Sequence, residues 1–473
     1  MTRVSTLPLS GLRVVDAATL AAGPLVATAL GEFGADVIKV EQPGAGDPLR
    51  TWGARRHDVG LVWKSVSRNK KCVTADLRTD DGRALLHGLL AVSDVLVLNT
   101  RPSTLARWGR DYESLHARHP KLVVLHVTGY GLGGPASDRP GFGTLAEAMS
   151  GFAHVCGQAD GPPTLPPFML ADGVAAQSAT YAVMTALYHR DVHGAGGQLV
   201  DVSLIEPLAR LIEQATLAYD QLGRIQGRSG NRADASAPRN AYRTADDRWI
   251  AISSASSSVA ARLYRAIDRP DLAARPEYVD PIPRQARADE IDALVTEWIR
   301  AHTLDQAMKV FLSEDVAAAP IYDAQQLLAD EHLRARGTFV AVDDPDLGAM
   351  TVQAPVARLS VTPGRIEHLG RAGRGQRDRV RRSARSGRRA SQGIARQGDD
   401  LRSTRRIPAT ATRPATARRR CMRACSATTA NGPSTPVRCP SPMRFSLPRR
   451  TKSPRPAPSS PTTVARRPTV RAR

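Results

Sequence analysis

The first part of the chain alternates between short apolar runs and longer segments of mixed polarity. Five apolar runs predict buried strands, at residues 12–16, 36–41, 72–77, 94–98 and 121–128. Three segments between them are typical of helices, at residues 24–33, 80–92 and 103–118. Because parallel strands need crossover connections, which are usually helices, the alternation predicts a Rossmann-like α/β domain with helices on both faces of a parallel sheet.

A long helix is predicted next, at residues 174–190. Its apolar residues recur at i, i+3, i+4 and i+7 between Thr180 and Leu187, so one face should pack inward. After a glycine-rich turn, residues 198–202 predict another strand and residues 204–222 a second long helix.

The pattern changes after residues 224–239, a polar, glycine-containing stretch that we interpret as a linker. One strand and three helices follow, at residues 249–252, 259–267, 289–301 and 304–313. They predict a small α+β domain at residues 225–319, within the usual size of a domain. Mixed structure resumes at Pro320, with two strands at residues 339–342 and 350–352.

Composition divides the chain near residue 370. The whole chain carries a formal net charge of +21, yet 28 of its 66 basic residues and 3 of its 45 acidic residues lie in residues 371–473. That tail is rich in Arg, Ala, Pro, Ser and Thr, and Phe445 is its one aromatic residue. It has too few large apolar side chains to offset the entropy lost on folding, so we predict that it is disordered.

Two origins are open for this tail. It is either a basic appendage that binds polyanions such as nucleic acid non-specifically, or the product of a reading-frame shift in a GC-rich gene. The near absence of lysine beside abundant arginine, and the abrupt change after Leu369-Gly370, favour the frameshift. Resequencing the gene across codons 365 to 375 distinguishes the two, and an intact frame would exclude the second.

Cysteine usage says little about this chain, although it fits a reducing cytoplasm. Before the tail the chain has two cysteines, Cys72 and Cys156, so no disulfide framework is implied. The three tail cysteines have no nearby histidine, and we predict no metal site. The sequence shows neither a run of 18 apolar residues nor a signal-peptide pattern, so we expect a cytoplasmic protein with no membrane association.

A glycine-rich segment after the strand at 121–128 resembles a dinucleotide fingerprint. Gly129-Tyr130-Gly131-Leu132-Gly133-Gly134 matches GxGxxG. The fingerprint requires a helix to begin there, so that its N-terminus meets the pyrophosphate, whereas Pro135 and Pro140 extend the loop. We interpret the segment as a turn or active-site loop, and an NAD-dependent oxidoreductase stays a weaker alternative.

Asp172 stands where an extended segment gives way to the long helix. Pro166 and Pro167 disfavour helix just before it, so Asp172 is predicted at the helix N-terminus. One interpretation is an N-cap, for which Asp is among the best residues. The other is a nucleophile, because the helix dipole favours an ionised carboxylate by ~0.3–1 kcal/mol. Position alone favours the cap.

Five stretches form an ordered set of motifs along residues 8–370. They are Leu20-Ala21-Ala22-Gly23-Pro24; Gly34-Ala35-Asp36-Val37-Ile38-Lys39-Val40-Glu41 with Gly46-Asp47-Pro48-Leu49-Arg50; Asn99-Thr100-Arg101-Pro102; Thr128-Gly129-Tyr130-Gly131; and Gly194-Ala195-Gly196-Gly197-Gln198-Leu199-Val200-Asp201-Val202-Ser203-Leu204-Ile205-Glu206. Together they resemble the class III CoA-transferases, the CaiB/BaiF family that includes formyl-CoA and carnitine CoA-transferases. Members normally close with a further helix after the equivalent of Gly370.

The resemblance implies a fold and a mechanism. It implies that residues 1–224 and 320–370 form one large Rossmann-like domain, with the small domain inserted between them, and that two chains interlink like rings. It makes Asp172 the match to the catalytic aspartate, which attacks an acyl-CoA thioester and passes CoA to a carboxylic acid through aspartyl anhydride and aspartyl-CoA intermediates. Coenzyme A is then a substrate, and no permanently bound cofactor is expected.

The resemblance also implies contacts with coenzyme A. Arg78 and Arg107 match positions that contact CoA, whose phosphates suit arginine, and Tyr130 matches a residue that lines the pocket. A solvated surface charge is the alternative for each arginine. Ala21 stands where some members have glutamine, and residues 236–240 lie where some have a run of glycines, so oxalate or formyl-CoA specificity does not carry over.

An acyl-CoA racemase of the same fold is the nearest alternative function. Racemases that resemble this chain use a histidine thirty residues before the aspartate, where this chain has Phe142. A phenyl ring cannot transfer a proton, so the transferase is favoured. From other classes, the NAD-dependent oxidoreductase and a polyanion-binding protein acting through the tail stay open.

Overall fold

A computed structural model describes residues 6–234 and 236–373 of the chain. The tail predicted to be disordered, residues 371–473, lies outside these ranges except for its first three residues. Within the described residues, no helix combines the length and apolar character that crossing a membrane requires.

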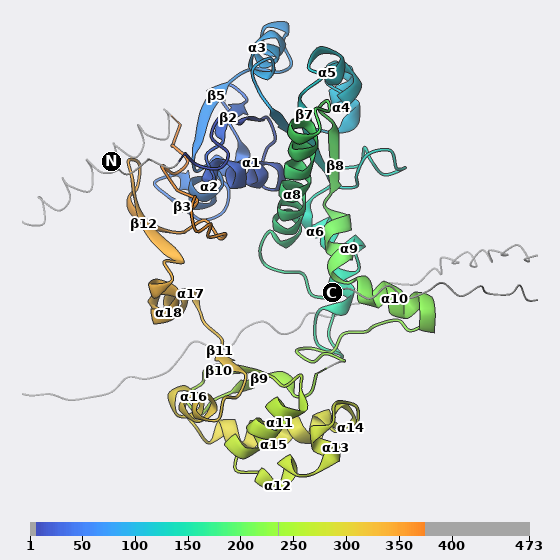
Figure 1. Cartoon of the computed structure of the whole chain (residues 1–473), viewed down its shortest axis with the longest axis vertical. Coiled ribbons are helices and arrows are strands. Elements are labelled where there is room, and N and C mark those ends of the chain that lie inside the picture. The colour runs from blue at the N-terminus through green and yellow to red at the C-terminus, as the bar shows by residue number, and fades with distance from the viewer. Residues whose placement is uncertain (1–5, 235, 374–473) are drawn as a thin grey trace, which may run out of the picture. The chain divides into compact units, whose positions relative to one another are not determined.

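A six-stranded sheet forms the centre of the first half of the chain (Figure 1). Its strands lie in the order β5-β2-β1-β6-β7-β8, and every neighbouring pair is parallel. Their bounds are β1 Arg13–Asp16, β2 Asp36–Glu41, β5 Lys70–Thr74, β6 Val95–Leu98, β7 Val123–Thr128 and β8 Leu199–Ser203. This is the doubly wound order in which the chain reverses direction across the sheet between β1 and β6. Ligands of such sheets bind at the carboxyl ends of the strands at this switch point.

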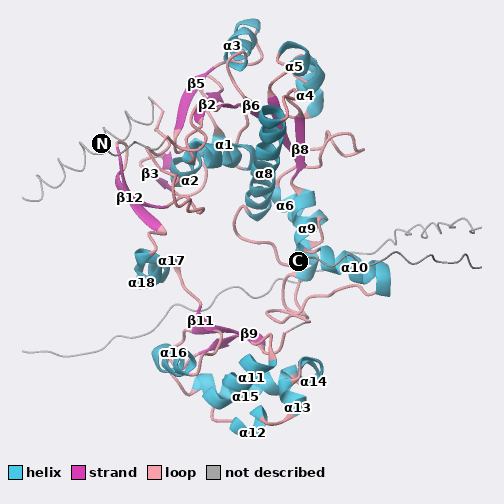
Figure 2. Cartoon of the chain, in the orientation of Figure 1, coloured by secondary structure: helices cyan, strands magenta, loops and turns pink. Residues whose placement is uncertain are grey.

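Helices cover both faces of the sheet, as the alternating pattern predicted (Figure 2). On one face, α1 (Ala22–Glu32) and α8 (Leu170–Val192) share a core with Val14 of β1. On the other face, α3 (Asp80–Leu90), α4 (Pro102–Arg107) and α5 (Tyr112–Arg118) share a core with Val15. Successive strand residues point to opposite faces, so apolar residues throughout these strands indicate burial on both sides.

Two predicted long helices are each broken in the structure. The helix predicted at residues 103–118 is α4 and α5, because Gly109 between them has φ +64°, a conformation that interrupts a helix. The helix predicted at residues 204–222 is α9 (Ile205–Leu211) and α10 (Glu213–Leu222), separated at Ile212. Helical periodicity continues across both breaks, which explains the error.

Shorter elements connect the sheet strands. Between β2 and β5 lie η1 (Pro48–Arg50), β3 (Arg55–Arg56), β4 (Val59–Gly60) and α2 (Leu61–Val66), and between β7 and α8 lie α6 (Gly143–Met149) and α7 (Phe152–Val155). Residues 129–142, which contain the GxGxxG match, form a loop without a helix, as predicted from Pro135 and Pro140.

A separate hydrophobic core forms around a three-stranded antiparallel sheet of order β11-β10-β9. The strands are β9 (Arg239–Arg243), β10 (Trp249–Ser253) and β11 (Ala318–Pro320). The helices are α11 (Ser257–Ala266), α12 (Pro270–Ala273), α13 (Pro276–Val279), α14 (Pro281–Ala286), α15 (Ala288–Arg300) and α16 (Leu304–Ser313). Strands β9 and β11 escaped the sequence analysis because they are short and carry little alternation.

The return segment contains α17 (Ala324–Ala329), α18 (Glu331–Ala335) and the hairpin of β12 (Phe339–Asp344) and β13 (Gly348–Gln353). The buried Lys64 of α2 donates to Asp344 at 2.8 Å and to Asp346 at 2.7 Å in the hairpin turn. The N–H of Gly370 then donates to the carbonyl of Lys64 at 3.1 Å. The last described residues therefore pack against α2, within the first half of the chain.

Candidate functional site

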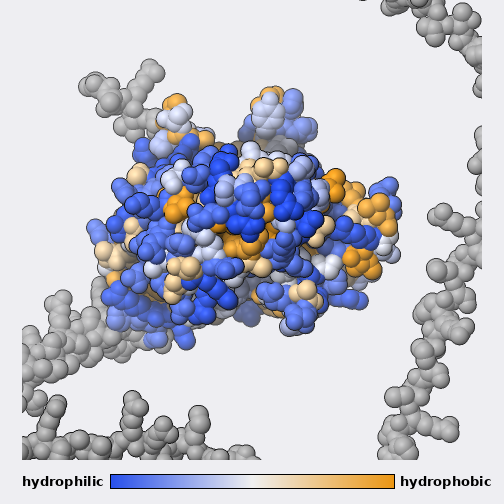
Figure 3. All heavy atoms as spheres, turned by 90° about the horizontal axis from the view of Figure 1, so that it is seen from below, coloured by the Kyte–Doolittle hydropathy of each residue, from blue (hydrophilic) through white to orange (hydrophobic). Residues whose placement is uncertain are grey.

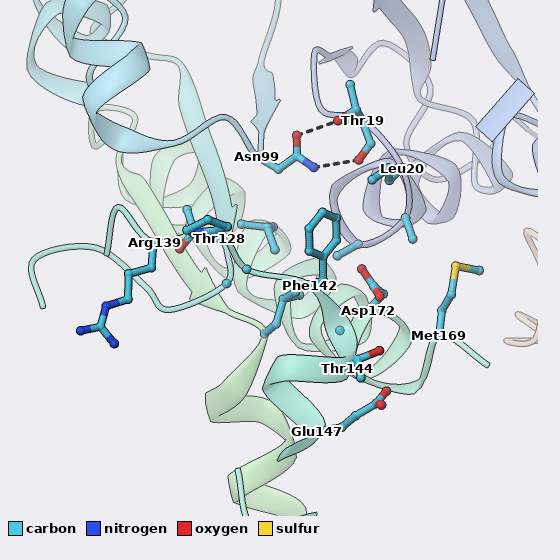
Figure 4. Close-up of a pocket in the computed structure, with 18 of the residues that line it drawn as sticks. Thr19, Leu20, Asn99, Thr128, Arg139, Phe142, Thr144, Glu147, Met169 and Asp172 are labelled. Atoms are coloured by element: carbon cyan, nitrogen blue, oxygen red, sulfur yellow. Dashed lines mark hydrogen bonds between the residues drawn. The ribbon is translucent and has the colours of Figure 1, made fainter. Parts of the chain in front are cut away.

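A cavity of about 560 Å³ lies at the switch point of the parallel sheet (Figure 4). The loop after β1 contributes Thr19 to Ala22, and the loop after β6 contributes Asn99 and Arg101. The rest of the lining comes from the loop after β7, α6, residues 166–169, Asp172 of α8, Leu49, Trp52 and Leu204. The site thus stands where a doubly wound sheet is expected to bind its ligand.

Asp172 lies in the first turn of α8 and lines this cavity. The helix begins at Leu170, and its N-cap residue is Met169, which makes no side-chain cap. The interpretation of Asp172 as the N-cap is therefore wrong. Its carboxylate is instead half-buried and turned toward the cavity, near the positive end of the helix dipole (Figure 4).

Another helix also begins next to this carboxylate. The backbone N–H of Ala22, the first residue of α1, lies close enough to the Asp172 carboxylate to lower its pKa. The first residue of α6, Gly143, packs so closely that a Cβ atom there would lie 2.7 Å from Oδ2 of Asp172. Only glycine allows this approach, so the position of the carboxylate depends on both neighbouring helix starts.

Burial opposes ionisation of Asp172. Desolvation raises the pKa of Asp172, and hydrogen bonds from the backbone N–H groups of Ala22 and of Asp172 itself act in the opposite direction. Desolvation prevails, so the helix dipole alone does not describe this group. A carboxylate that is poorly solvated and held by few donors is a more reactive nucleophile than one in water.

A second carboxyl group lies beside the first. Glu147 of α6 is 2 % exposed and lines the cavity, and its Oε1 accepts a hydrogen bond of 3.3 Å from the N–H of Ala171. Desolvation raises the pKa of Glu147, and the nearby charge of Asp172 raises it further. Two carboxyl groups in one low-dielectric site disfavour each other's ionisation.

The remaining lining combines polar and apolar groups. Asn99 is fixed to Thr19 by two hydrogen bonds, from its Nδ2 to the carbonyl at 2.7 Å and from the Thr19 N–H to its Oδ1 at 2.9 Å. The ring of Phe142 lies between Asn99 and Asp172, whereas the guanidinium of Arg139 points away from Asp172 (Figure 4). The cavity therefore places the Asp172 carboxylate near an apolar ring, with Arg101 and Arg139 also in the lining.

The three other residues predicted for the site are not among those lining the cavity. Arg78 pairs with Asp76 at 2.9 Å and is largely exposed, and Arg107 donates to Thr104 at 3.3 Å. Tyr130 packs beside Gly141 in the loop after β7. The structure thus brings only Asp172 of the predicted set into the cavity.

Several lining residues escaped the sequence analysis as candidates. Ala22, Asn99 and Arg101 belong to the quoted motifs, and their positions directly after β1 and β6 were the available signal. Glu147 and Gly143 carried no signal, because their closeness to Asp172 depends on how α6 packs against α8. In the described part of the chain, no group of three or more His, Cys, Asp or Glu residues is arranged to hold a metal ion.

Comparison with known proteins adds an independent line of evidence. The model of CoA-transferase family III matches residues 9–370. The succinyl-CoA–D-citramalate CoA-transferase of Chloroflexus aurantiacus is 39% identical over 366 residues, which cover 77% of this chain and 91% of that protein. The alpha subunit of succinyl-CoA–L-malate CoA-transferase from the same organism is 38% identical over 367 residues, covering 77% and 86%. Among solved structures, a CAIB/BAIF family protein from Brucella suis aligns with a TM-score of 0.69 and 28% identity, covering 80% of this chain and 100% of that one.

Replacing both carboxyl groups, by Asp172→Asn with Glu147→Gln, should change how stability depends on pH. Burial raises the pKa of both groups in the folded state, so the wild-type protein loses stability as pH rises from about 4 through their folded pKa values. The double variant lacks this loss. In urea unfolding curves at a series of pH values, the free energy of unfolding of the double variant, relative to that of wild type, should increase as pH rises toward neutral.

Asp138→Asn is the matched control, with the opposite sign. Hydrogen bonds with Ser103 hold the pKa of Asp138 below its usual range, so this group adds stability above its unfolded pKa and loses it in acid. The control variant should be less stable than wild type near neutral pH and equal to it at low pH. A double variant that behaved like the control would contradict burial as the dominant effect at Asp172 and Glu147.

Proposed function

The chain belongs to the class III CoA-transferase family, and from this premise we propose that Asp172 is the nucleophile through which it moves CoA from an acyl-CoA to a carboxylic acid. The observation that carries the proposal is the Asp172 carboxylate itself. It faces the cavity from the first turn of α8 and receives the N–H of Ala22.

The proposed reaction has two symmetrical halves. The ionised carboxylate attacks the thioester carbonyl, the C–S bond breaks, and an aspartyl anhydride and CoA thiolate form. The thiolate attacks the Asp172 carbonyl, which gives aspartyl-CoA and releases the donor acid. An acceptor carboxylate attacks aspartyl-CoA to form a second anhydride, and the released thiolate takes the acceptor acyl group, which restores Asp172. No proton moves, so no general base is needed.

The groups around Asp172 fit these steps. The Ala22 N–H lies next to the Asp172 carboxylate, whose oxygen carries the negative charge in the two tetrahedral intermediates formed by attack on the Asp172 carbonyl, and a preorganised donor there lowers the barrier. Burial and the nearby charge of Asp172 raise the pKa of Glu147, which makes its ionisation beside anionic substrates less favourable. Phe142 and the apolar lining shield the anhydrides from water.

We propose a dicarboxylic donor such as succinyl-CoA and a hydroxy-dicarboxylic acceptor. Relatives at 38% to 40% identity are named succinyl-CoA–malate and succinyl-CoA–citramalate CoA-transferases. Arg101 and Arg139 line the cavity and suit a carboxylate or a phosphate. Arg78 and Arg107, exposed near the same edge of the sheet, stay our proposed contacts for the phosphates of CoA, and Tyr130 for the loop over the pocket.

The racemase alternative is not favoured by the residues of the cavity. Proton transfer at the α-carbon requires an acid and base pair, and histidine is the usual partner of the aspartate. Among the described residues that line this cavity there is no histidine, and Phe142 occupies the corresponding position.

We also propose that two chains form a dimer. On α8, Tyr181 and Tyr188 are 68% and 61% exposed, and on α10 Leu222 is 74% exposed. Figure 3 shows apolar side chains gathered toward the right-hand end of the face in view, the end where Figure 1 places α10. Exposed apolar surface of this kind is typical of protein interfaces. Light scattering should give twice the chain mass of 50.8 kDa, and a monomer would refute the proposal.

Trapping with hydroxylamine tests the nucleophile. Incubated with succinyl-CoA and hydroxylamine, the protein should form a hydroxamate at Asp172, because hydroxylamine attacks the aspartyl carbonyl of the anhydride or thioester. Peptide mass spectrometry locates the adduct. Asp172→Ala should form none and lose transfer, whereas Asp305→Ala, at an exposed carboxylate of α16, should behave as wild type. Undiminished transfer by Asp172→Ala would refute the assignment.

Gly143→Ala tests the close approach of α6. The added Cβ would lie 2.7 Å from Oδ2 of Asp172 and displace it, so kcat should fall roughly 10- to 100-fold. Gly173→Ala is the matched control, because a Cβ at this neighbouring glycine meets nothing within 4 Å. Steady-state kinetics should give kcat for both variants. Equal kcat values would show that the close approach of Gly143 to Asp172 does not control activity.

A further inference from the structure

Residues 17–22, the loop after β1 together with the first residue of α1, carry the N–H that lies against Asp172 and are called the loop 17–22 below. This loop also supplies Thr19, Leu20, Ala21 and Ala22 to the cavity. Leu20 has φ +62°, a left-handed conformation that residues other than glycine rarely adopt. Such a conformation persists only where the surrounding structure enforces it, so the contacts that hold this loop also determine where Ala22 stands.

Charged and polar side chains from three other segments hold the loop backbone. Asp47, after β2, accepts from the Leu20 N–H at 3.3 Å and from the Leu49 N–H at 2.9 Å. Lys39 of β2 donates to the Ala18 carbonyl. Asn99, after β6, holds Thr19 at both its N–H and its carbonyl.

These side chains form part of a buried network of charges. Lys39 is 1% exposed and lies 3.0 Å from Asp47 and 3.6 Å from Asp16. Lys70, also buried, lies 2.9 Å from Asp16 and donates to the carbonyl of Pro24 in α1 at 2.6 Å. Two cations and two anions are thus packed beneath one loop and the first turn of the helix that follows it.

Burial of so many charges is not an efficient source of stability. Apolar residues of similar volume often stabilise a protein as well as a buried ion pair does, because removing charges from water is costly. What charged groups add is direction, because Lys39 and Asp47 each bond a particular backbone atom of the loop. The network therefore points to a role in conformation rather than in overall stability.

We propose that Lys39 and Asp47 are positioning residues that hold the loop 17–22 so that the Ala22 N–H meets the Asp172 carboxylate. The proposal rests on the proposed function, in which that carboxylate is the nucleophile. Neither side chain lines the cavity, so both act through the backbone of Ala18 and Leu20 rather than on substrate.

The chain offers a matched control for this network. Lys64 is fully buried and bonds two carboxylates, Asp344 and Asp346, but these lie in the hairpin turn and do not touch the loop. Lys64→Met and Lys39→Met therefore remove the same kind of buried charge. Lys39→Met removes a contact with the loop that carries the Ala22 N–H, whereas Lys64→Met does not.

The experiment compares Lys39→Met, Asp47→Asn, their double variant and Lys64→Met. Asp47→Asn keeps a side-chain oxygen that can accept from the N–H groups of Leu20 and Leu49, and the double variant removes one positive and one negative charge. We therefore expect these two variants to fold, which thermal unfolding checks. For the network variants kcat should fall roughly 10- to 100-fold, with KM for succinyl-CoA changed less than about threefold. Lys64→Met should lose stability and keep its kcat.

The pH profile provides a readout that a purely structural defect would not move. The Ala22 N–H acts to lower the pKa of Asp172, so its displacement should shift the acidic limb of the kcat profile to higher pH. Within the cavity, Asp172 is approached by this N–H from α1 and by Glu147 from α6, and Arg101 and Arg139 also line the cavity, with the guanidinium of Arg139 pointing away from Asp172. All the variants leave the side chains in this set unchanged.

Replacing Ala22 by lactate, which exchanges its N–H for oxygen, gives the reference shift. Lys39→Met in that background should add no further shift, because both changes remove one contact. Folded network variants with kcat within about twofold of wild type and an unmoved limb would overturn the proposal. The proposed function would stand in that case, provided that hydroxamate still forms at Asp172; absence of the hydroxamate in wild-type protein would refute the function itself.

Discussion

The contact between the Ala22 N–H and the Asp172 carboxylate joins the two helices that cover one face of the sheet. It requires α1 and α8 to begin at the same point, above the carboxyl ends of β1 and β6. Gly143 must lack a side chain for the Asp172 carboxylate to keep its position, and the loop 17–22 takes a path in which Leu20 has a left-handed conformation. The cavity is the space that these requirements leave open.

In the proposed mechanism, a buried carboxylate that must react as an anion faces two opposing demands. Desolvation raises its pKa and makes it more nucleophilic, whereas donors at helix starts keep enough of it ionised. Glu147 is buried beside it, and the negative charges of these two carboxyl groups oppose each other's ionisation. Backbone donors suit the task because they cannot rotate away, and fixing them is then a matter of fixing the loop. The buried charges at Lys39, Asp47, Asp16 and Lys70 lie where such fixing is needed.

The doubly wound sheet explains why residues far apart in sequence share this site. Loops after β1, β6 and β7 converge at the switch point. The first turn of α8, which follows them in the sequence, lies at the same point. This arrangement serves many chemistries, so the fold alone does not define the reaction. The carboxylate, the phenyl ring of Phe142 where a racemase needs a base, and the family match together support transfer of CoA.

The sequence by itself determined the parallel sheet, most strand positions, the loop at residues 129–142 and the candidacy of Asp172. These follow from local pattern: period, proline and glycine placement, and ordered motifs. The sequence wrongly predicted continuous helices across Gly109 and Ile212, because helical periodicity continues on both sides of each break. Its position alone also favoured an N-cap for Asp172, which lies instead inside the first turn of the helix.

Only the tertiary structure decided what surrounds the carboxylate. Ala22 is 150 residues away and Glu147 is 25 residues away from Asp172 along the chain. No local sequence pattern indicates that either residue lies next to Asp172. Arg78 and Arg107, which motif position favoured, lie outside the cavity lining. The physical reason is that a pKa, a close approach or a donated hydrogen bond depends on how helices pack on the sheet. Local sequence patterns specify which face of a helix is apolar, but not which backbone atom of one helix meets a side chain of another.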